Sequence, residues 1–229
     1  MIAALAVVAP PDVGSFGYIA GQLLDGLVTA LKLTGATLLI ALPLALLLAI
    51  LSDSRLAVAR WPALVVVELG RGLPLLILLY LMYQGLPQLA VTLSSFTTAL
   101  IAFSWATAAY ATEIVRGSLG AIPRGQFEAA RAVGLSSGDV YRFAILPQAG
   151  RVALPPLLNL AIQIFQLTSI TFVIGLPEIM QHAYLGTTVN FLYMKTFLMA
   201  GALYAAIALP GSALVGILDK RLSRHVQTV

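Results

Sequence analysis

Five long apolar stretches constrain this chain more than any other feature of its sequence. They cover residues 26–51, 61–86, 96–115, 152–175 and 190–218. Each has at least about the 20 residues that an α-helix needs to cross the hydrocarbon core of a bilayer. We therefore predict an all-α fold, a polytopic membrane protein of about five transmembrane helices that forms one transmembrane domain over residues 1–229.

The composition supports the same class. Hydrophobic residues make up 60% of the chain and charged residues only 10%, whereas soluble domains carry about 25% charged residues. Too few polar side chains remain to cover a surface that faces water. This excludes an ordinary soluble enzyme, a disordered chain and a nucleic-acid-binding domain, so membrane lipid and not nucleic acid is the expected surrounding of the protein.

The sequence shows no pattern of residues that indicates catalysis or metal binding. There is no cysteine, and the two histidines, His182 and His225, are isolated. We therefore expect no catalytic residues, no metal site and no cofactor in this chain. The apolar N-terminus, residues 1–9, lacks a basic segment and stops at Pro10, so we expect neither a signal peptide nor a span there.

The positions of lysine and arginine predict the orientation. Eleven of the 13 fall on one side of a five-span topology, and only Lys32 and Lys195 fall toward the other. Arg71 is counted with the majority because it is assigned to the start of the second span. Cytoplasmic loops carry the excess of positive charge. We therefore expect an outside N-terminus, a cytoplasmic C-terminus and a cytoplasmic loop over residues 116–151.

This loop contains two helix signals. Pro123 suits a first helical turn and Gly134 suits a left-handed C-cap. Ser136 or Ser137 then caps a second helix, which Pro147 ends. The sequence thus predicts two short cytoplasmic helices joined at a tight corner.

Apolar side chains occur in this loop where water is expected. They are Phe127, Val133, Leu135, Val140, Tyr141 and Phe143. One interpretation is that they pack against the ends of the spans. The other is that they form a docking surface for a soluble partner, since exposed apolar patches mark interaction sites.

The loop also resembles that of a known family. Glu128-Ala129-Ala130, then Gly134, then Ile145-Leu146-Pro147, is similar to the coupling loop of ABC importer permeases, and Gly125-Gln126 resembles the polar amino acid branch. Further similar motifs are Arg71-Gly72-Leu73-Pro74, Ala109-Tyr110-Ala111-Thr112-Glu113-Ile114-Val115-Arg116-Gly117, Pro147-Gln148-Ala149, Thr168-Ser169-Ile170 and Val173-Ile174-Gly175-Leu176-Pro177-Glu178. The family commonly has Lys-Asp where this chain has Gln166-Leu167.

The resemblance implies a permease subunit of the bacterial inner membrane. It would form the translocation pathway for polar amino acids or their derivatives, pair with a second permease subunit, identical or different, and receive substrate from an extracytoplasmic binding protein. A dimer of ATP-binding subunits would bind ATP and magnesium, so this chain would not be an enzyme. The residues implied to couple to the ATPase are Gly125, Gln126, Glu128, Ala129, Ala130, Gly134, Leu146 and Pro147.

The fourth apolar stretch contains polar residues with helical spacing. Asn159, Gln163 and Gln166 lie on one helix face, and Thr168 and Ser169 follow. Polar groups within a span are costly unless they face protein or water. They either hydrogen-bond between helices or line a pathway in which amides bind an amino acid without a buried net charge.

The third stretch adds Tyr110 and Glu113, followed by Arg116. Glu113 either binds a cationic group of the substrate or pairs with Arg116 along its own helix. Glu68 and Arg71 have the same spacing, and a structural pair is expected there. The candidate pathway therefore comprises Tyr110, Glu113, Asn159, Gln163, Gln166, Thr168 and Ser169.

An ion-driven secondary transporter is the alternative function. That class usually shows repeated halves with broken spans at corresponding positions, and no internal repeat is visible in this sequence. A purely structural membrane protein would not explain the amide stripe.

Overall fold

The structure, a computed structural model, describes residues 15–223. Met1–Ala9, Arg224 and His225 lie outside these residues. The helical elements, in chain order, are α1 (Phe16–Ser52), α2 (Ala57–Gly72), α3 (Leu75–Tyr80), η1 (Leu81–Gly85), η2 (Leu86–Leu89), α4 (Ser95–Gly120), α5 (Arg124–Ala132), α6 (Ser137–Asp139), η3 (Val140–Ile145), α7 (Leu146–Leu167), η4 (Thr168–Ile174), α8 (Ile179–Asn190) and α9 (Tyr193–Ser223).

These helices confirm the all-α class and the number of spans. Four helical segments are long and apolar enough to cross a membrane, namely α1, α4, residues 137–174 and α9. The bent pair that α2 forms with residues 75–89 is a fifth span if it counts as one crossing. The sequence therefore predicts the architecture correctly, although several boundaries differ.

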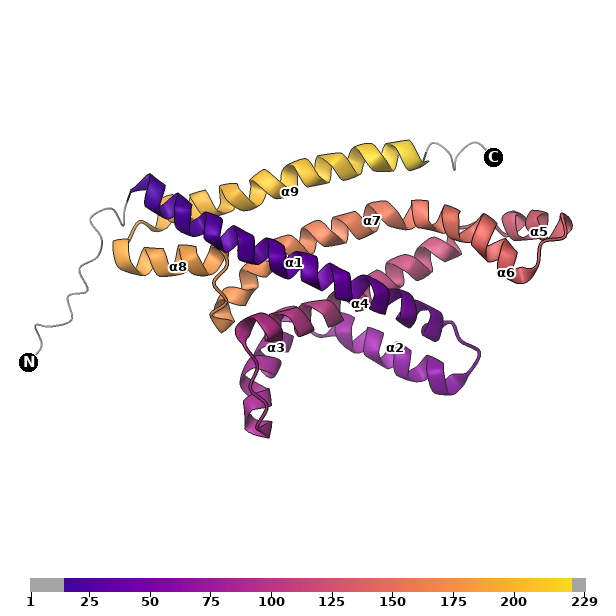
Figure 1. The fold of residues 1–229 in the computed structure, drawn as a ribbon, viewed down its shortest axis with the longest axis horizontal. Helices are drawn as coiled ribbons and strands as arrows, with labels where there is room; N and C mark the ends of the chain where they lie inside the picture. The colour runs from indigo at the N-terminus through magenta and orange to yellow at the C-terminus, as the bar shows by residue number, and fades with distance from the viewer. Residues whose placement is uncertain (1–14, 224–229) are drawn as a thin grey trace, which may run out of the picture.

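The long helices lie side by side and pack through small residues. α1 contacts α4 and α8, α4 contacts α7, and α7 contacts α9, as Figure 1 shows. Ala41 and Ala45 of α1 and Ala102 and Ala108 of α4 are buried in the largest hydrophobic cluster. Small side chains allow helix backbones to approach closely in a membrane, where van der Waals packing drives association.

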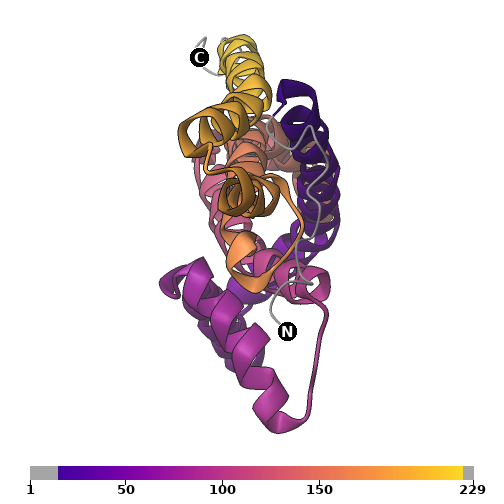
Figure 2. The same ribbon diagram turned by 90° about the vertical axis from the view of Figure 1, so that its left-hand side faces the viewer.

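The bundle has two distinct ends. One end contains residues 121–145, with α5 and α6, and is called the coupling-loop end after the family loop that these residues resemble. The α8 end contains α8 and the first turns of α1 and α9 (Figure 1). Residues 75–94 project from the side of the bundle, as Figures 1 and 2 both show.

The second predicted span, over residues 61–86, is not one continuous helix in the structure. α2 and the segment from Leu75 are bent by 104° relative to one another. Leu73, which precedes Pro74, has an extended ψ of 128°, because a proline ring disfavours the helical conformation of the residue before it. Arg71 therefore lies at the bend, in the last turn of α2, and not at the start of a span.

The second helix of the loop also differs from the prediction. Pro147 does not end it but lies in the first turn of α7, where the missing N–H of proline costs nothing. Residues 137–174 form one continuous helical segment. The structure thus joins the loop directly to the span that carries the amide stripe.

The α8 end contains a helix that the sequence analysis missed. α8 packs on α1 at Gly26, where a Cβ would lie 2.5 Å from the backbone nitrogen of Ile179. Glu178 caps α8, because its Oε1 accepts from the Gln181 N–H at 2.8 Å. Its Oε2 accepts from the Tyr204 hydroxyl of α9 at 2.6 Å. One buried carboxyl group therefore holds α8 against α9.

Burial raises the pKa of Glu178 to about 7, although the hydrogen bonds from Tyr204 and Gln181 favour the ionised form. Between pH 4.5, the ordinary pKa, and about pH 7, the folded protein keeps a proton that the unfolded chain has lost. Stability therefore falls as the pH rises through this range. The difference in pKa corresponds to about 3 kcal/mol.

We predict that Glu178→Gln flattens the dependence of the thermal unfolding midpoint on pH between 4.5 and 7. The glutamine still accepts a hydrogen bond at the start of α8 but carries no charge, so the variant should unfold at a higher temperature than the unmodified protein at pH 8. Unfolding in detergent measures this, with Asp25→Asn, an exposed carboxyl on α1, as the control. An unchanged pH profile in Glu178→Gln would contradict the prediction.

Candidate functional site

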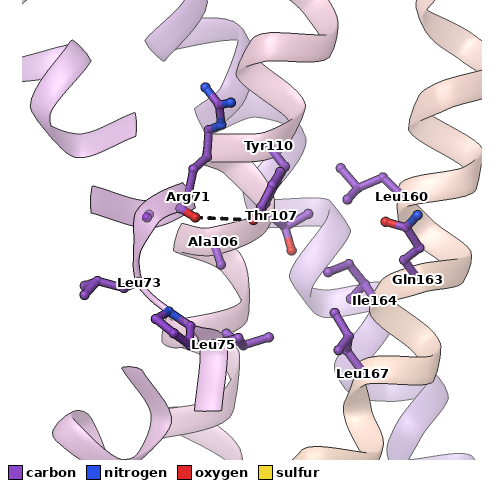
Figure 3. A pocket seen from close by; sticks show the side chains of 13 residues that line it. Arg71, Leu73, Leu75, Ala106, Thr107, Tyr110, Leu160, Gln163, Ile164 and Leu167 are labelled. Carbon is purple, nitrogen blue, oxygen red and sulfur yellow. Dashed lines mark hydrogen bonds between the residues drawn. The ribbon is translucent and has the colours of Figure 1, made fainter. Parts of the chain in front are cut away.

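A cavity of about 400 Å³ lies where the bend of the second span meets α4 and α7. Figure 3 shows that the three segments surround it. The residues that line it are Gly70–Leu75 from the bend, Ala106, Thr107 and Tyr110 from α4, and Leu160, Gln163, Ile164 and Leu167 from α7. Most of this lining is apolar, with few polar groups, which is typical of small-molecule sites.

Two side chains of α4 hold the bend in place. The Trp105 indole donates a hydrogen bond from Nε1 to the Val66 carbonyl at 3.0 Å, and the Tyr110 hydroxyl donates to the Arg71 carbonyl at 3.3 Å. A broken helix frees backbone carbonyls, and within a membrane these must find partners in the protein or in a water-filled cavity. Tyr110 therefore satisfies a carbonyl that the break frees, that of Arg71, whereas Trp105 donates to a carbonyl within α2 and ties α2 to α4.

Gly70 allows this close packing. A Cβ at this position would lie 2.7 Å from the Ala109 Cβ and 2.9 Å from the Trp105 Nε1. α2 and α4 thus approach at a distance that only glycine permits. Neither Trp105 nor Gly70 was predicted from the sequence, although Gly70 directly precedes the Arg71-Gly72-Leu73-Pro74 motif.

Three neutral polar side chains meet in the cavity. Gln163 extends from α7 toward Thr107 and Tyr110 of α4 (Figure 3). Thr107 is fully buried, and its Oγ1 has no hydrogen-bond partner among the described residues. A buried hydroxyl without a partner is costly, but the Thr107 Oγ1 has almost no accessible surface, so a ligand or water reaches it only if neighbouring side chains move. Thr107 is a further residue that the sequence analysis missed.

The other predicted polar residues, which lie on α7 and at the start of η4, do not line this cavity. Asn159 lines a separate hollow of about 280 Å³ that α7 forms with α9, beside Ser212 and Asp219. Gln166 is exposed. The hydroxyls of Thr168 and Ser169 donate to the carbonyls of Phe165 and Gln166. Of the predicted pathway residues, the structure thus brings only Gln163 and Tyr110 together in the cavity.

Glu113 lies one turn beyond Tyr110 on α4. The pair expected along this helix is present, because Arg116 Nη1 donates to Glu113 Oε1 at 2.8 Å. The pair between Glu68 and Arg71 is also present, with 3.8 Å between Oε1 and Nη1. These charged groups lie between the cavity and the coupling-loop end.

The corner of the loop has the predicted backbone geometry. Gly134 has a φ of 83°, the left-handed conformation that glycine adopts without strain. The Ser136 hydroxyl accepts from the Asp139 N–H at 3.3 Å and so caps the second helix. Across the corner, Gln148 Nε2 donates to Gln126 Oε1 at 3.1 Å. This last contact fixes α5 against the start of α7, and the sequence analysis missed the role of Gln148.

The apolar residues of the loop divide between the two interpretations. Phe127, Leu135 and Val140 belong to a small hydrophobic cluster within the loop. Val133 and Phe143 have 76% and 64% of their surface exposed, and Tyr141 is half exposed. Leu146, Pro147, Gly125, Glu128 and Ala129 are also exposed, whereas Ala130 is buried. The loop therefore has its own core and displays an apolar surface at the tip.

Among the described residues, no group of three or more His, Asp or Glu side chains could hold a metal ion. His182 lies in α8.

The fold and site define a class: a multi-pass helical membrane protein with a broken span beside a cavity and a structured loop at one end. The chain belongs to the family of inner membrane components of binding-protein-dependent transport systems, whose model matches residues 41–224. It is therefore a permease subunit of such a transport system. This membership gives no support to the ion-driven alternative.

Individual proteins support this membership. The chain is similar to the probable amino-acid ABC transporter permease protein YckA of Bacillus subtilis, with 38% identity over 76% of each chain. It is similar to the arginine transport system permease protein ArtQ of the same organism, with 34% identity over 82% of this chain and 86% of ArtQ. A crystal structure of an amino acid ABC transporter with histidines has a TM-score of 0.86 and 30% identity, and the alignment covers 93% of this chain and all of the other.

Proposed function

We propose that the chain imports amino acids or closely related derivatives through the cavity between the broken span, α4 and α7. The observation that carries this proposal is the meeting of Gln163, Thr107 and Tyr110 in one cavity of about 400 Å³. Amide and hydroxyl groups both donate and accept hydrogen bonds. They can replace the hydration of a zwitterion without adding an unpaired charge, which would be expensive within a membrane.

The relatives support amino acids as the substrate class but do not select one amino acid. ArtQ is named for arginine, and two further similar proteins are named as an L-cystine transport system permease protein and a glutamate/aspartate import permease protein. In this chain the exposed Gln166 occupies a position where the family commonly has lysine, so its α7 presents no positive charge there. The neutral side chains of Gln163, Thr107 and Tyr110 suit the common zwitterionic part of an amino acid.

The coupling partner is proposed to be a dimer of ATP-binding subunits, which binds ATP and magnesium and carries out hydrolysis. The exposed tip of the loop supports this, because Val133, Tyr141 and Phe143 form an apolar surface on a structured corner. A second permease subunit and an extracytoplasmic binding protein complete the proposed assembly, in keeping with the name of the family. This chain then acts as a pathway and not as an enzyme.

The orientation is proposed from the charges. Arg124, Arg131 and Arg142 lie at the coupling-loop end, and Lys220 and Arg221 lie at the end of α9. An excess of positive charge favours the cytoplasmic side. The coupling-loop end is then cytoplasmic and the α8 end faces outward.

We predict that Gln163→Leu raises the substrate concentration needed for half-maximal stimulation of ATPase activity by roughly 5- to 150-fold, the cost of stranding a polar partner. The measurement uses the complete transporter with its binding protein in nanodiscs. Gln166→Leu is the matched control, since it removes an amide one turn away that does not line the cavity. Basal ATPase activity should stay unchanged in both variants.

Equal effects of the two glutamine variants would contradict the assignment of the cavity. No effect of either variant would show that the amides serve only in helix packing.

We predict that Gly134→Asp and Glu128→Lys abolish transport while the protein still inserts into the membrane. A side chain at Gly134 strains the left-handed backbone, and the lysine reverses the charge of an exposed residue on α5. Uptake and copurification of the ATP-binding subunit measure the effect. Gly138→Ala, at a loop glycine without a positive φ, is the control. Normal uptake in Gly134→Asp would refute the role of the corner.

We predict that a reporter fused after Val229 is cytoplasmic and that one inserted near Gly186 in α8 is external. Alkaline phosphatase and a fluorescent protein report the two compartments. A cytoplasmic signal at Gly186 would reverse the orientation.

A further inference from the structure

Five charged side chains form a continuous series from the cavity toward the coupling-loop end. Arg71 lies at the bend, with its Nη1 3.8 Å from Glu68 Oε1 and 3.6 Å from Glu113 Oε2. Glu113 Oε1 accepts from Arg116 Nη1 at 2.8 Å, and Arg116 Nε donates to Asp53 Oδ1 at 3.1 Å. The series connects α2, α4 and the segment that follows α1.

The contacts of this series are unequal. Charge-assisted hydrogen bonds are about 2.7–2.9 Å long. The contact of Arg116 with Glu113, at 2.8 Å, lies within this range, and its contact with Asp53, at 3.1 Å, is slightly longer. Those of Arg71 are longer, and its side chain is 36% exposed. Arg71 therefore has donor groups that its two carboxylate neighbours do not fully use. The residue lines the cavity, where its carbonyl accepts from Tyr110, and its guanidinium points away from Gln163 and Thr107 (Figure 3).

The contact between Arg71 and Glu113 can break without stranding Glu113. The two oxygens of Glu113 serve different arginines, Oε2 facing Arg71 and Oε1 accepting from Arg116. Arg116 in turn keeps its bond to Asp53. The second acidic neighbour of Arg71, Glu68, is 70% exposed. After this contact opens, Arg71 keeps one carboxylate neighbour, Glu68, whose Oε1 is 3.8 Å away.

Glu68 is exposed and 3.8 Å away, so it pairs Arg71 only weakly, and a charged side chain in a span is costly unless it is paired or hydrated. Arg71 can leave Glu113 at low cost only if another anion takes its place. A carboxylate suits the exchange, since the planar guanidinium binds carboxylates through two parallel hydrogen bonds. The carboxylate of a molecule that leaves the cavity would satisfy this requirement.

We propose that Arg71 binds the carboxylate of the transported molecule where it leaves the cavity toward the coupling-loop end. The carboxylate of the transported molecule replaces that of Glu113 on the guanidinium. The net charge of the series then changes only by the charge of the transported molecule. Arg71 thereby selects for substrates with a free carboxylate. This inference rests on the proposed passage of amino acids through the cavity and adds the charged group that the neutral lining of Gln163, Thr107 and Tyr110 lacks.

The experiment uses the complete transporter in proteoliposomes, with ATP and the binding protein. The probe is a ¹³C-labelled mixture of the twenty L-amino acids and cystine, and mass spectrometry measures total uptake. We expect Arg71→Gln to lower the initial rate by about tenfold or more, and Arg71→Lys, which keeps the charge but not the planar fork, to lower it less. Arg60→Gln, an arginine of α2 that stacks on Trp61, should transport normally.

A double variant separates binding from a structural role. If Arg71 only neutralises Glu113, then Arg71→Gln combined with Glu113→Gln should restore uptake, because no charge is left stranded. If Arg71 binds the carboxylate, the double variant should remain defective. Recovery to more than about half of the normal rate would overturn the proposal.

Glu113→Gln alone retains Arg71, so its uptake should stay within about threefold of normal, and a loss as large as that of Arg71→Gln would also overturn the proposal. Normal uptake in Arg71→Gln together with impaired uptake in Gln163→Leu would refute the role of Arg71 and leave the cavity as the pathway. Impaired uptake in Arg71→Gln but not in Gln163→Leu would refute the role of the amide instead.

Discussion

The functional architecture depends on the need to satisfy backbone hydrogen bonds within a membrane. A helix that breaks in lipid exposes carbonyl groups, and each unsatisfied group costs several kcal/mol. At the break after Gly72, Tyr110 of α4 donates to the freed carbonyl of Arg71, and Trp105 holds α2 against α4 through the Val66 carbonyl. The same contacts fix the wall of the cavity. The contacts that stabilise the broken span therefore also form the site. The close packing at Gly70 brings Trp105 and Tyr110 within hydrogen-bonding distance of α2.

The sequence was sufficient to predict the class, the approximate number of spans and the corner of the loop. These features depend on local signals, namely apolar runs of sufficient length and the cap residues Gly134 and Ser136. The bend of the second span was not predicted, because hydropathy stays high across Leu73-Pro74-Leu75 and conceals a change of backbone direction. α8 was missed because its 12 residues are too few to cross a membrane and too mixed in character to show a clear period.

The site was predicted only in part, for a geometric reason. Asn159 and Gln163 lie one turn apart on α7, but α7 packs against α4 and against α9. Their side chains therefore line different hollows. Helical spacing indicates a shared face but does not show which neighbour covers each part of that face. Thr107 was missed because a single threonine within an apolar span gives no periodic signal.

The continuous helical segment over residues 137–174 connects the loop to the cavity. From Ser137 to Gln163 it extends about 39 Å at 1.5 Å per residue. A helical connection between two sites has a thermodynamic consequence, because linkage between them is reciprocal. If binding of a molecule at the corner of Gly134 displaces this segment and changes the affinity at Gln163, occupation of the cavity must change the affinity at the corner by the same factor. The same helical segment would then carry the effect in both directions, from the corner to the cavity and from the bound substrate back to the corner.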